Sequence, residues 1–236
     1  MRVMISQSMY FPWHGFLSQI SMCDLYIQYD GVRYSKGSFT NRVQVQLPDR
    51  SEISWMTIPI KRASLVKNIC QTFPDKTKPW PREHSGLLKH AYGGTSNYEM
   101  VKDLFVTFSN SLDVEFDVGS IALNSTRIVC DYLGIGKSLG WINGNDLYNE
   151  LSGTQRVIAI LEHFGAKRYL SGLGGKNYLE TELFEKSGIT LEYMSYGVKQ
   201  YPQMFGGFKS EVSILDMIAH LGVEAPNYFA STIERG

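Results

Sequence analysis

The amino-acid sequence predicts one α/β domain over residues 1–236, with a mostly parallel sheet and a helical insertion over roughly residues 80–165. Two observations support this prediction. Strand-like and helix-like segments alternate in the first thirty residues and again in the last third of the chain, which is the pattern of parallel βαβ units. Between these two parts, apolar residues recur at helical spacing.

The N-terminal segments give the layout strand, loop, helix, strand. RVMIS (2–6) and LYIQYD (25–30) are short β-rich runs, and the apolar residues of FLSQISM (16–22) between them suit a helix. RVQVQL (42–47) and ISWMTIPI (53–60) indicate two further strands. The turn-rich PDRS between them can join these strands as a hairpin.

The middle of the chain is predicted to be mainly helical. Residues 74–94 contain three prolines and end in two glycines, so we expect this stretch to be rich in loops. Residues 97–112 and 120–135 carry apolar side chains at helical spacing. Residues 146–166 predict one long helix, or two helices with a break at Ser152–Gly153.

The last third alternates between strands and helices again. KRYLSG (167–172) and ITLEYMSY (189–196) predict strands, and a glycine turn in 173–188 opens a helix between them. SEVSILDMIAHLG (210–222) predicts a closing helix with Ser210 or Ser213 as N-cap. This alternation, like that of the first thirty residues, favours a Rossmann-like arrangement of the sheet.

The 236 residues hold 23 Lys and Arg against 23 Asp and Glu, so the formal net charge is zero. This balance argues against a protein that coats nucleic acid or an anionic membrane. Hydrophobic residues make up 43% of the chain, which is enough for a sizeable core. Residues 1–67 nevertheless hold eight cations against four carboxylates, so the N-terminal third is locally basic.

The cysteines Cys23, Cys70 and Cys130 are too few and too scattered for a disulfide framework or a metal site. We interpret them as small buried side chains in a reducing compartment. The N-terminal residues lack the apolar core of a signal peptide, and the sequence contains no apolar run that could span a membrane. We therefore expect a cytoplasmic protein.

Three segments could carry chemistry. The first is QSMYFPWHGF (7–16), which follows a predicted strand and precedes a predicted helix, where open α/β sheets bind ligands. Gln7, Tyr10, Trp13 and His14 offer hydrogen bonds and stacking surfaces there. The alternative is that the aromatic residues only fill the core around a tight turn.

The second segment, YDGVRYSKGSFTNRVQ (29–44), lies at another strand end. Lys36 and Arg42 could clamp a phosphate, and Asp30 could orient an amine or act as a base. The segment also contains the polar residues Arg33, Tyr34, Ser35 and Asn41. A solvated loop is the alternative interpretation.

The third segment, YLSGLGGKNYL (169–179), places Gly172, Gly174 and Gly175 between a strand and a helix. Backbone N–H groups there could cradle an anion, assisted by Lys176. The spacing matches neither common phosphate-binding glycine motif, so a plain strand–turn–helix corner is the alternative.

Other chemistries have weaker support. The histidines His14, His84, His90, His163 and His220 form no metal-ligand motif, and the sequence contains no nucleophile elbow. Lys36 and Lys176 are the lysines to consider for a Schiff base with a pyridoxal cofactor. The sequence identifies no cofactor. The loop KQYPQMFGGF (199–208) can close over a ligand or merely pack.

Taken together, these segments resemble the WbqC-like protein family of bacterial polysaccharide loci. The matching motifs are Q-x-x-YFPW-x-GF (7–16), DLYIQYD with V-x-YSK (24–36), NR (41–42), W-x-x-IP (55–59), LN (123–124), YLSG-x-GG-x-x-Y (169–178), and QMF followed by SILDMI (203–218). The resemblance adds Ser171, Tyr178 and Gln203 to the expected substrate-binding residues. The chain departs from the family pattern at Ser8–Met9, where Pro–Asn is expected, and at Gly31 and Arg33, where Asp and Gln are common.

The family resemblance implies transfer of glycine or a related amino acid onto a sugar. We therefore expect a transferase that places an amino acid or acyl group on an amino sugar or a nucleotide-activated sugar. In this hypothesis Lys36, Arg42 and the turn 172–175 hold a phosphate or carboxylate, Asp30 or His14 is the base, and Tyr10 and Trp13 stack on a ring.

Two alternatives remain open: an amino-acid transferase acting on a hypermodified base of phage-type DNA, and a non-catalytic nucleotide- or sugar-binding module. The expected partner is a small molecule that carries a ring and a phosphate or carboxylate. Nucleic acid is a less favoured partner, and no membrane partner is expected. The strand–YFPWHG–helix opening also resembles nucleotidyltransferases with an HxGH motif, but only one of the two histidines is present.

Overall fold

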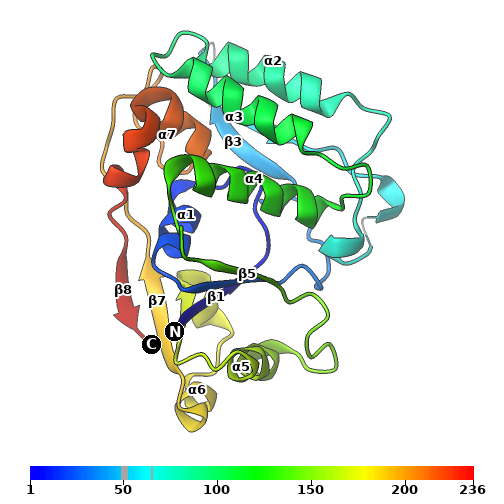
Figure 1. Cartoon of the computed structure of the whole chain (residues 1–236), viewed down its shortest axis with the longest axis vertical. Helices are drawn as coiled ribbons and strands as arrows, with labels where there is room; N and C mark the ends of the chain where they lie inside the picture. Colours follow the sequence, from blue (N-terminus) through cyan, green and yellow to red (C-terminus); the bar gives the residue numbers. More distant parts are fainter. Residues whose placement is uncertain (49–52, 65) are drawn as a thin grey trace.

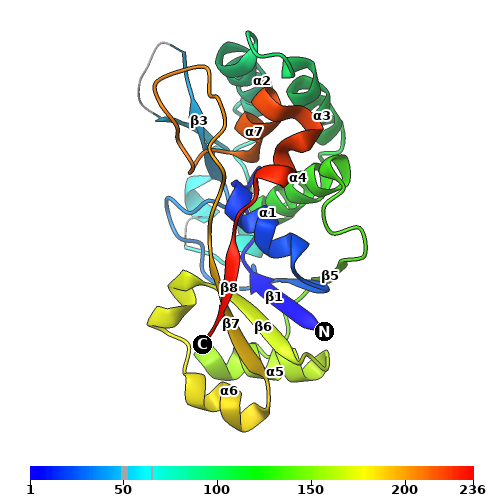
Figure 2. The same cartoon turned by 90° about the vertical axis from the view of Figure 1, so that its left-hand side faces the viewer.

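The computed structural model describes residues 1–48, 53–64 and 66–236. In these residues six strands form one sheet in the order β5-β2-β1-β6-β7-β8 (Figures 1 and 2). The strands are β1 (Arg2–Ser6), β2 (Leu25–Gln28), β5 (Gly140–Asn143), β6 (Arg168–Gly172), β7 (Thr190–Ser195) and β8 (Thr232–Arg235). All neighbouring pairs are parallel except β7 with β8, which confirms the mostly parallel α/β fold.

Helices cover both faces of this sheet. On one face lie α1 (His14–Ser21), α4 (Val118–Leu133) and α7 (Ile214–Leu221), with α2 (Trp80–Tyr92) and α3 (Tyr98–Asn110) beyond them (Figure 2). On the other face lie α5 (Gly153–His163) and α6 (Thr181–Ser187). Short 3₁₀ turns occupy Arg62–Ser64, Ile69–Gln71, Leu173–Asn177 and Gly222–Tyr228.

The strands feed two separate apolar cores because successive side chains point to opposite faces. Met4 and Tyr26 belong to the core with α1, α3, α4 and α7. Val3, Ile5 and Ile27 belong to the second core, against α5 and α6. The central strands β1 and β2 are therefore apolar on both faces, as expected of a covered parallel sheet.

The predicted hairpin is also confirmed. β3 (Arg42–Gln46) and β4 (Ile53–Thr57) pair antiparallel as a separate two-stranded sheet. Most of the predicted PDRS turn that joins them, residues 49–51, lies outside the described residues. The hairpin is held against the main core by its buried face, which includes Val43, Val45 and Met56.

The prediction that residues 74–94 form mainly loop is wrong, because α2 occupies Trp80–Tyr92. Pro79 precedes the helix and Pro81 lies in its first turn. Proline is tolerated at these positions, since the first backbone N–H groups of a helix have no partner within the helix. The prolines therefore mark the start of α2.

The helical middle region consists of α2, α3 and α4, and it ends earlier than the predicted boundary near residue 165. β5 follows at Gly140–Asn143 and joins the edge of the sheet beside β2. Residues 146–166, predicted as one long helix or as two with a break at Ser152–Gly153, contain the single α-helix α5, which begins at that break and ends at His163. β5 has only four residues and follows a Gly-rich stretch, so its sequence shows no clear hydrophobic periodicity.

The sequence analysis also overlooked β8. Its residues, TIER, have only one apolar side chain, and β8 pairs antiparallel with β7 at the sheet edge. Ser213 is the predicted N-cap that the structure confirms: its Oγ accepts the Leu215 N–H at 3.2 Å at the start of α7. No helix in the described part of the chain has the length and apolar character needed to cross a bilayer.

Candidate ligand-binding groove

The sheet reverses its winding direction between β1 and β6. β1 lies at the centre, with β2 on one side and β6 on the other. The chain connections diverge from this point, so the loops after Ser6 and Gly172 leave a crevice at the carboxyl edge. Ligands bind at such switch points in open α/β sheets.

Two adjoining cavities, of about 470 Å³ and about 300 Å³, occupy this crevice. They share Ile5 and Ser6 of β1, Met9, Tyr169 of β6 and Tyr178. We call them together the switch-point groove. Its remaining lining residues are Gln7, Trp13, Phe16, Gln19, Tyr29, Val32, Gly153, Val157, Ser171, Gly172, Gly174, Gly175 and Tyr196.

The groove has an uncharged lining rich in aromatic rings. None of its lining residues, all of which belong to the described part of the chain, is Asp, Glu, Lys, Arg or His. Burial raises the pKa of Tyr178, and it raises the pKa of Tyr196 to about 12, so both phenols are neutral at physiological pH. The lining can therefore stack on a ring and exchange hydrogen bonds with hydroxyl groups.

Two consecutive hydrogen bonds fix the side of the groove that Trp13 and Tyr196 form. The Tyr196 hydroxyl donates to Gln19 Oε1 at 3.1 Å, and Gln19 Nε2 donates to the Leu170 carbonyl at 2.8 Å. The Tyr196 and Trp13 ring centroids are 4.9 Å apart. α1, β6 and β7 are thus linked directly behind the aromatic wall.

The predicted glycine turn forms the opposite wall. Gly172 ends β6, and residues Leu173–Asn177 make one 3₁₀ turn. Ser171 Oγ donates to the Gly172 carbonyl at 3.1 Å. Lys176 pairs with Glu234 at 2.5 Å, and it is not among the groove-lining residues. The turn therefore brings Ser171, Gly174 and Gly175 to the groove without a cation.

The YFPW segment divides between core and groove. Tyr10 and Phe11 are completely buried, and the Tyr10 hydroxyl donates to Nδ1 of His84 at 2.9 Å. The Tyr10 ring is thus enclosed in the core and is not exposed for stacking on a ligand. Trp13 and Gln7, by contrast, line the groove.

Phe11 has the positive backbone angle φ of 39°, which is rare outside glycine. Two hydroxyl groups hold this conformation. The Phe11 N–H donates to Ser125 Oγ at 2.9 Å, and Ser213 Oγ donates to the Phe11 carbonyl at 2.9 Å. The segment before the groove is therefore fastened to α4 and α7 on both sides.

His14 lies at the first position of α1 and is 4% exposed. Burial lowers its pKa to about 4, and the backbone of Ser210 opposes this shift. Its imidazole is therefore neutral at physiological pH, but it does not line the groove. Of these two neighbouring residues, Trp13 lines the groove and His14 does not.

Asp30 is fully buried at the junction of three strand ends. Its carboxylate accepts the Ser8 N–H at 2.9 Å, the Ser8 hydroxyl at 2.6 Å and Gln28 Nε2 at 2.7 Å. A Cβ at Gly119 would fall on Asp30 Oδ2, so only glycine lets the first turn of α4 approach this closely. Burial raises the pKa of Asp30, and the Ser8 and Gln28 hydrogen bonds oppose this rise.

Of the other residues expected in this segment, Tyr34, Asn41 and Arg42 make internal contacts. The Tyr34 hydroxyl donates to Asn41 Oδ1 at 2.7 Å, and Asn41 Nδ2 donates to the Ile58 carbonyl at 2.9 Å. The Arg42 guanidinium donates to the Gly37 carbonyl and lies 3.9 Å from the Trp55 ring centroid. Ser35 and Lys36 are exposed. None of these five residues lines the groove.

Gln203 is also used internally. Its Nε2 donates to Asp216 Oδ1 at 2.8 Å and to the Lys209 carbonyl at 3.0 Å, which anchors the loop 199–209 to α7. Burial raises the pKa of Asp216. Gln203 thus lies in a buried polar network and not among the groove-lining residues.

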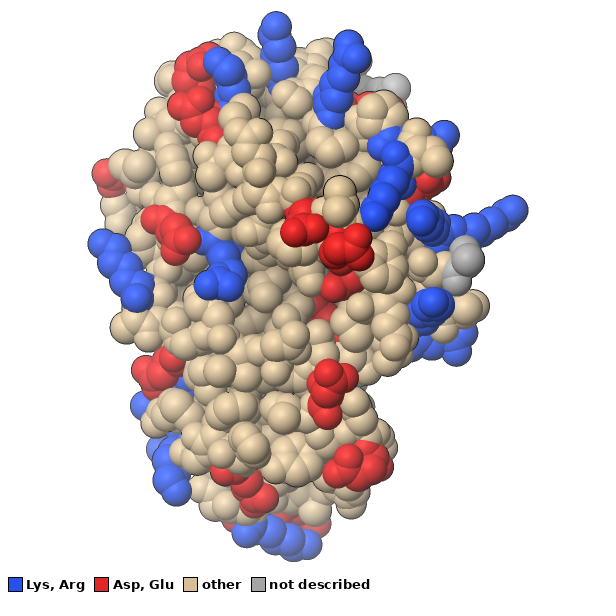
Figure 3. Space-filling view, turned by 45° about the vertical axis from the view of Figure 1, so that its right-hand side comes forward, with Lys and Arg blue, Asp and Glu red and all other residues tan. Residues whose placement is uncertain are grey.

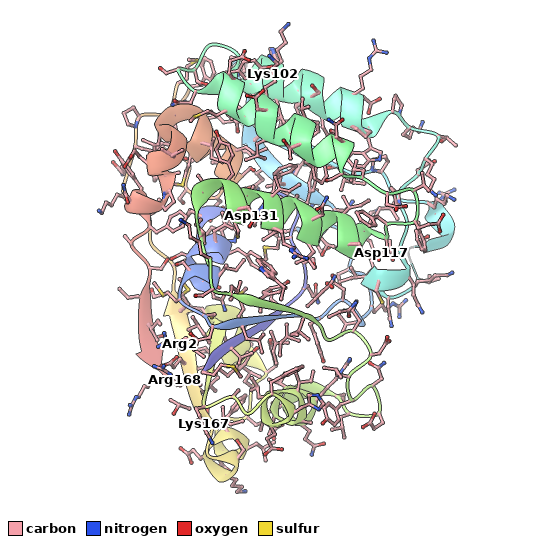
Figure 4. The ribbon with its side chains drawn as sticks, viewed as in Figure 1. Arg2, Lys102, Asp117, Asp131, Lys167 and Arg168 are labelled. Atoms are coloured by element: carbon pink, nitrogen blue, oxygen red, sulfur yellow. The ribbon has the colours of Figure 1, made fainter. Side chains whose placement is uncertain are left out.

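The charged side chains gather elsewhere on the surface. In the described part of the N-terminal third, the exposed cations are Arg33, Lys36, Lys61, Arg62 and Lys67. In Figure 3, a group of Lys and Arg side chains lies along the upper right-hand margin of the molecule. Several acidic side chains lie nearer the centre of the same face. Arg2, Lys167 and Arg168 lie at the amino ends of β1 and β6, opposite the groove (Figure 4).

The sequence analysis missed Met9, Gln19, Tyr29 and Tyr196 as groove residues, and it used Tyr169 only as part of a motif. Tyr29 and Tyr196 directly follow β2 and β7. Their position at the carboxyl ends of the predicted strands 25–30 and 189–196 was therefore a usable signal, because those strand ends share one edge. Among the described residues, His, Cys, Asp and Glu form no group of three able to hold a metal ion.

Comparison with known proteins places this fold in a family. The model of the WbqC-like protein family matches residues 7–228, which include the groove-lining segments after β1, β2, β6 and β7. The chain belongs to the WbqC-like protein family. A Mycobacterium tuberculosis protein titled "Uncharacterized protein Rv1507c" is 28% identical over 232 residues, which cover 96% of each chain. No solved structure matches the chain.

Proposed function

We propose that this WbqC-like protein is a transferase that places an amino acid or acyl group on an amino sugar or a nucleotide-activated sugar for surface-polysaccharide synthesis. The observation that carries this proposal is the uncharged, tyrosine-rich lining of the switch-point groove. Sugar rings offer an apolar face and several hydroxyl groups, which such a lining complements.

The groove residues divide this work by their chemistry. Tyr178 is 61% exposed and offers its ring to the ligand, while Trp13 is held against Tyr196. Ser6, Gln7 and Ser171 can exchange hydrogen bonds with sugar hydroxyls. These residues would bind and orient the acceptor, which lowers the entropic part of the barrier to transfer.

The transfer step itself needs an activated donor. The acceptor nitrogen or oxygen forms a bond to the carbonyl carbon, and the bond from that carbon to its leaving group breaks. Because no lining residue ionises near neutral pH, we assign the groove to positioning the reactants. The proton of the nucleophile then passes to the leaving group or to water.

The same absence of lining side chains that ionise near neutral pH favours a second candidate, a non-catalytic sugar- or nucleotide-binding module. Both candidates place the ligand in the groove, and only the transferase forms a covalent product. Mass spectrometry after incubation with an aminoacyl thioester and a nucleotide sugar distinguishes them. A new aminoacyl-sugar mass supports the transferase, and stoichiometric binding without product supports the module.

Binding is tested first, with nucleotide sugars and amino sugars in a thermal-shift titration. A ligand at 100 times its Kd stabilises the folded state by about 2.7 kcal/mol. Tyr178→Ala should weaken binding, whereas Leu173→Ala should not, because Leu173 is exposed on the same turn but does not line the groove. If Tyr178→Ala and the wild type bind every sugar equally, the proposed site is wrong.

A further inference from the structure

A third cavity, of about 400 Å³, adjoins the switch-point groove. Its lining residues are Met9, Trp13, Phe39 and Glu211. Met9 and Trp13 also line the groove, so the two spaces share a wall. We call this third cavity the Glu211 chamber.

The chamber differs from the groove in charge. Among the residues that the structure describes, Glu211 is the one charged residue lining the chamber, and none lines the groove. Glu211 is exposed, and its carboxylate makes no hydrogen bond or ion pair with any side chain or backbone group that the structure describes. An unpaired carboxylate at the rim of an aromatic cavity attracts a cation and repels a phosphate or carboxylate.

The backbone around Glu211 is fixed relative to the aromatic wall. Ser213, two residues later, forms an isolated antiparallel bridge with Trp13. The Ser213 N–H also donates to the Gln44 carbonyl at 2.8 Å, and the Ile214 N–H donates to the Pro12 carbonyl at 2.9 Å. These bonds fasten the segment after Glu211 both to the residues next to Trp13, at the start of α1, and to β3.

The aromatic residues reinforce the preference for a cation. Trp13 and Phe39 bring their rings to the chamber, and Phe39 is 39% exposed. The face of an aromatic ring attracts an ammonium group electrostatically. A carboxylate beside two rings is therefore suited to a small ammonium group with a short apolar stem.

From this arrangement we infer that the Glu211 chamber binds the free α-ammonium of an aminoacyl donor while the acceptor sugar occupies the groove. This inference rests on the proposed transferase function and makes it more specific. The acceptor amine must lose its proton to attack, so it is a poor partner for a carboxylate. The α-ammonium of the donor keeps its proton throughout the transfer.

The consequence is a choice between donors. The forming bond joins the acceptor nitrogen or oxygen to the donor carbonyl carbon, and the α-ammonium one carbon away takes no part in it. An aminoacyl group gains the contact with Glu211, and a plain acyl group of the same length does not. Glu211 is thus a specificity-determining residue for amino-acid transfer.

Glycinamide and acetamide are matched probes, because they differ mainly in the ammonium group. Ligand-detected NMR titration of the wild type should show glycinamide binding about three- to tenfold more tightly than acetamide. Glu211→Gln should remove most of this preference, and Phe39→Leu should reduce it. Glu162→Gln, an exposed change on α5 outside both cavities, should leave it intact.

A wild-type protein without the preference overturns the inference, as does a preference that is undiminished in Glu211→Gln. Both mutated side chains are exposed, and circular dichroism checks that the variants are folded. A nucleotide sugar is titrated against the same variants to test the groove separately. If the nucleotide sugar fails to bind but the glycinamide preference depends on Glu211, the proposed function fails and the ammonium site stands.

Discussion

Oδ1 of Asn145 accepts the backbone N–H of Asp30 at 2.7 Å. This bond joins the residues that follow β2 and β5, while the Asp30 carboxylate holds Ser8 after β1. The Asp30 carbonyl also accepts the Cys70 N–H at 3.0 Å. One buried residue therefore sets the relative positions of three strand ends beside the groove.

Asp30→Asn is expected to lower the free energy of unfolding by about 1–3 kcal/mol. The new amide can accept through only one atom, and its NH₂ group would face the donors of Ser8 or Gln28. Urea unfolding measures the change. Asp131→Asn, on the exposed side of α4 (Figure 4), is the control and should be nearly neutral.

The same variant also tests whether Asp30 is a catalytic base. Full stability with at least a hundredfold loss of turnover would favour that role. Lost stability with unchanged turnover per folded molecule would favour the structural role that its hydrogen bonds indicate.

Ser125→Ala is expected to destabilise the fold by about 1–3 kcal/mol, because it removes the partner of the buried Phe11 N–H. Phe11 has a positive φ, so its conformation depends on such contacts. Chemical denaturation of Ser125→Ala beside the exposed control Ser138→Ala measures the effect. Equal midpoints for the two variants would show that Ser125 does not hold the YFPW segment.

Stability should fall as pH decreases below about 6.5, and His84 contributes to this fall. Burial lowers the pKa of His84 from 6.5 to about 4. The unfolded chain therefore binds a proton at this imidazole before the folded chain does, and stability present at neutral pH is lost between about pH 6.5 and about pH 4. The full loss from this one group is roughly 3 kcal/mol.

Unfolding in urea at about pH 7 and about pH 5 measures this dependence. His84→Gln should flatten part of the slope, whereas His163→Gln, on the exposed end of α5, should not. An unchanged slope in His84→Gln would contradict the assignment.

Gly175→Ala and Gly174→Ala are expected to differ although they are neighbours. A Cβ at Gly175 would fall on Ser171 Oγ and lie 2.9 Å from Leu179 Cδ1, whereas a Cβ at Gly174 meets nothing within 4 Å. Thermal unfolding should therefore show a loss of about 1–3 kcal/mol only for Gly175→Ala. Ligand titration of the stable Gly174→Ala variant then tests whether an added methyl group in the groove hinders binding.

Much of the fold could be predicted because apolar residues recur with a clear spacing in most of its strands and helices. The apolar runs of β1, β2 and β7 and the helical spacing of α3 and α4 are local properties of the chain. β5 and β8 are short edge strands, and pairing with β2 and β7 defines them. Pairing of that kind depends on distant segments, so no local pattern reports it.

The candidate site was predictable by segment but less so by residue. The loops after β1 and β6 do meet, and Trp13, Ser171 and Tyr178 line the groove. Tyr10 lies in the loop after β1 and Asp30 follows β2, but both side chains point into buried networks. Residue type and spacing alone do not reveal which side of a loop faces the core, because packing against α2 and α4 decides it.

The pairing of β1 with β6 joins segments that are far apart in the chain, since Arg2 is opposite Arg168. During synthesis, β1 can pair with β2 as soon as both have emerged, but its other edge stays unpaired until β6 is made. A truncated chain ending before residue 168 would therefore expose the open edge of β1 and lack one wall of the groove. The ability to bind a ligand in the groove should therefore arise late in synthesis, after β6 has been made, and in a single step. A chain that ends before residue 168 should aggregate through the exposed edge of β1.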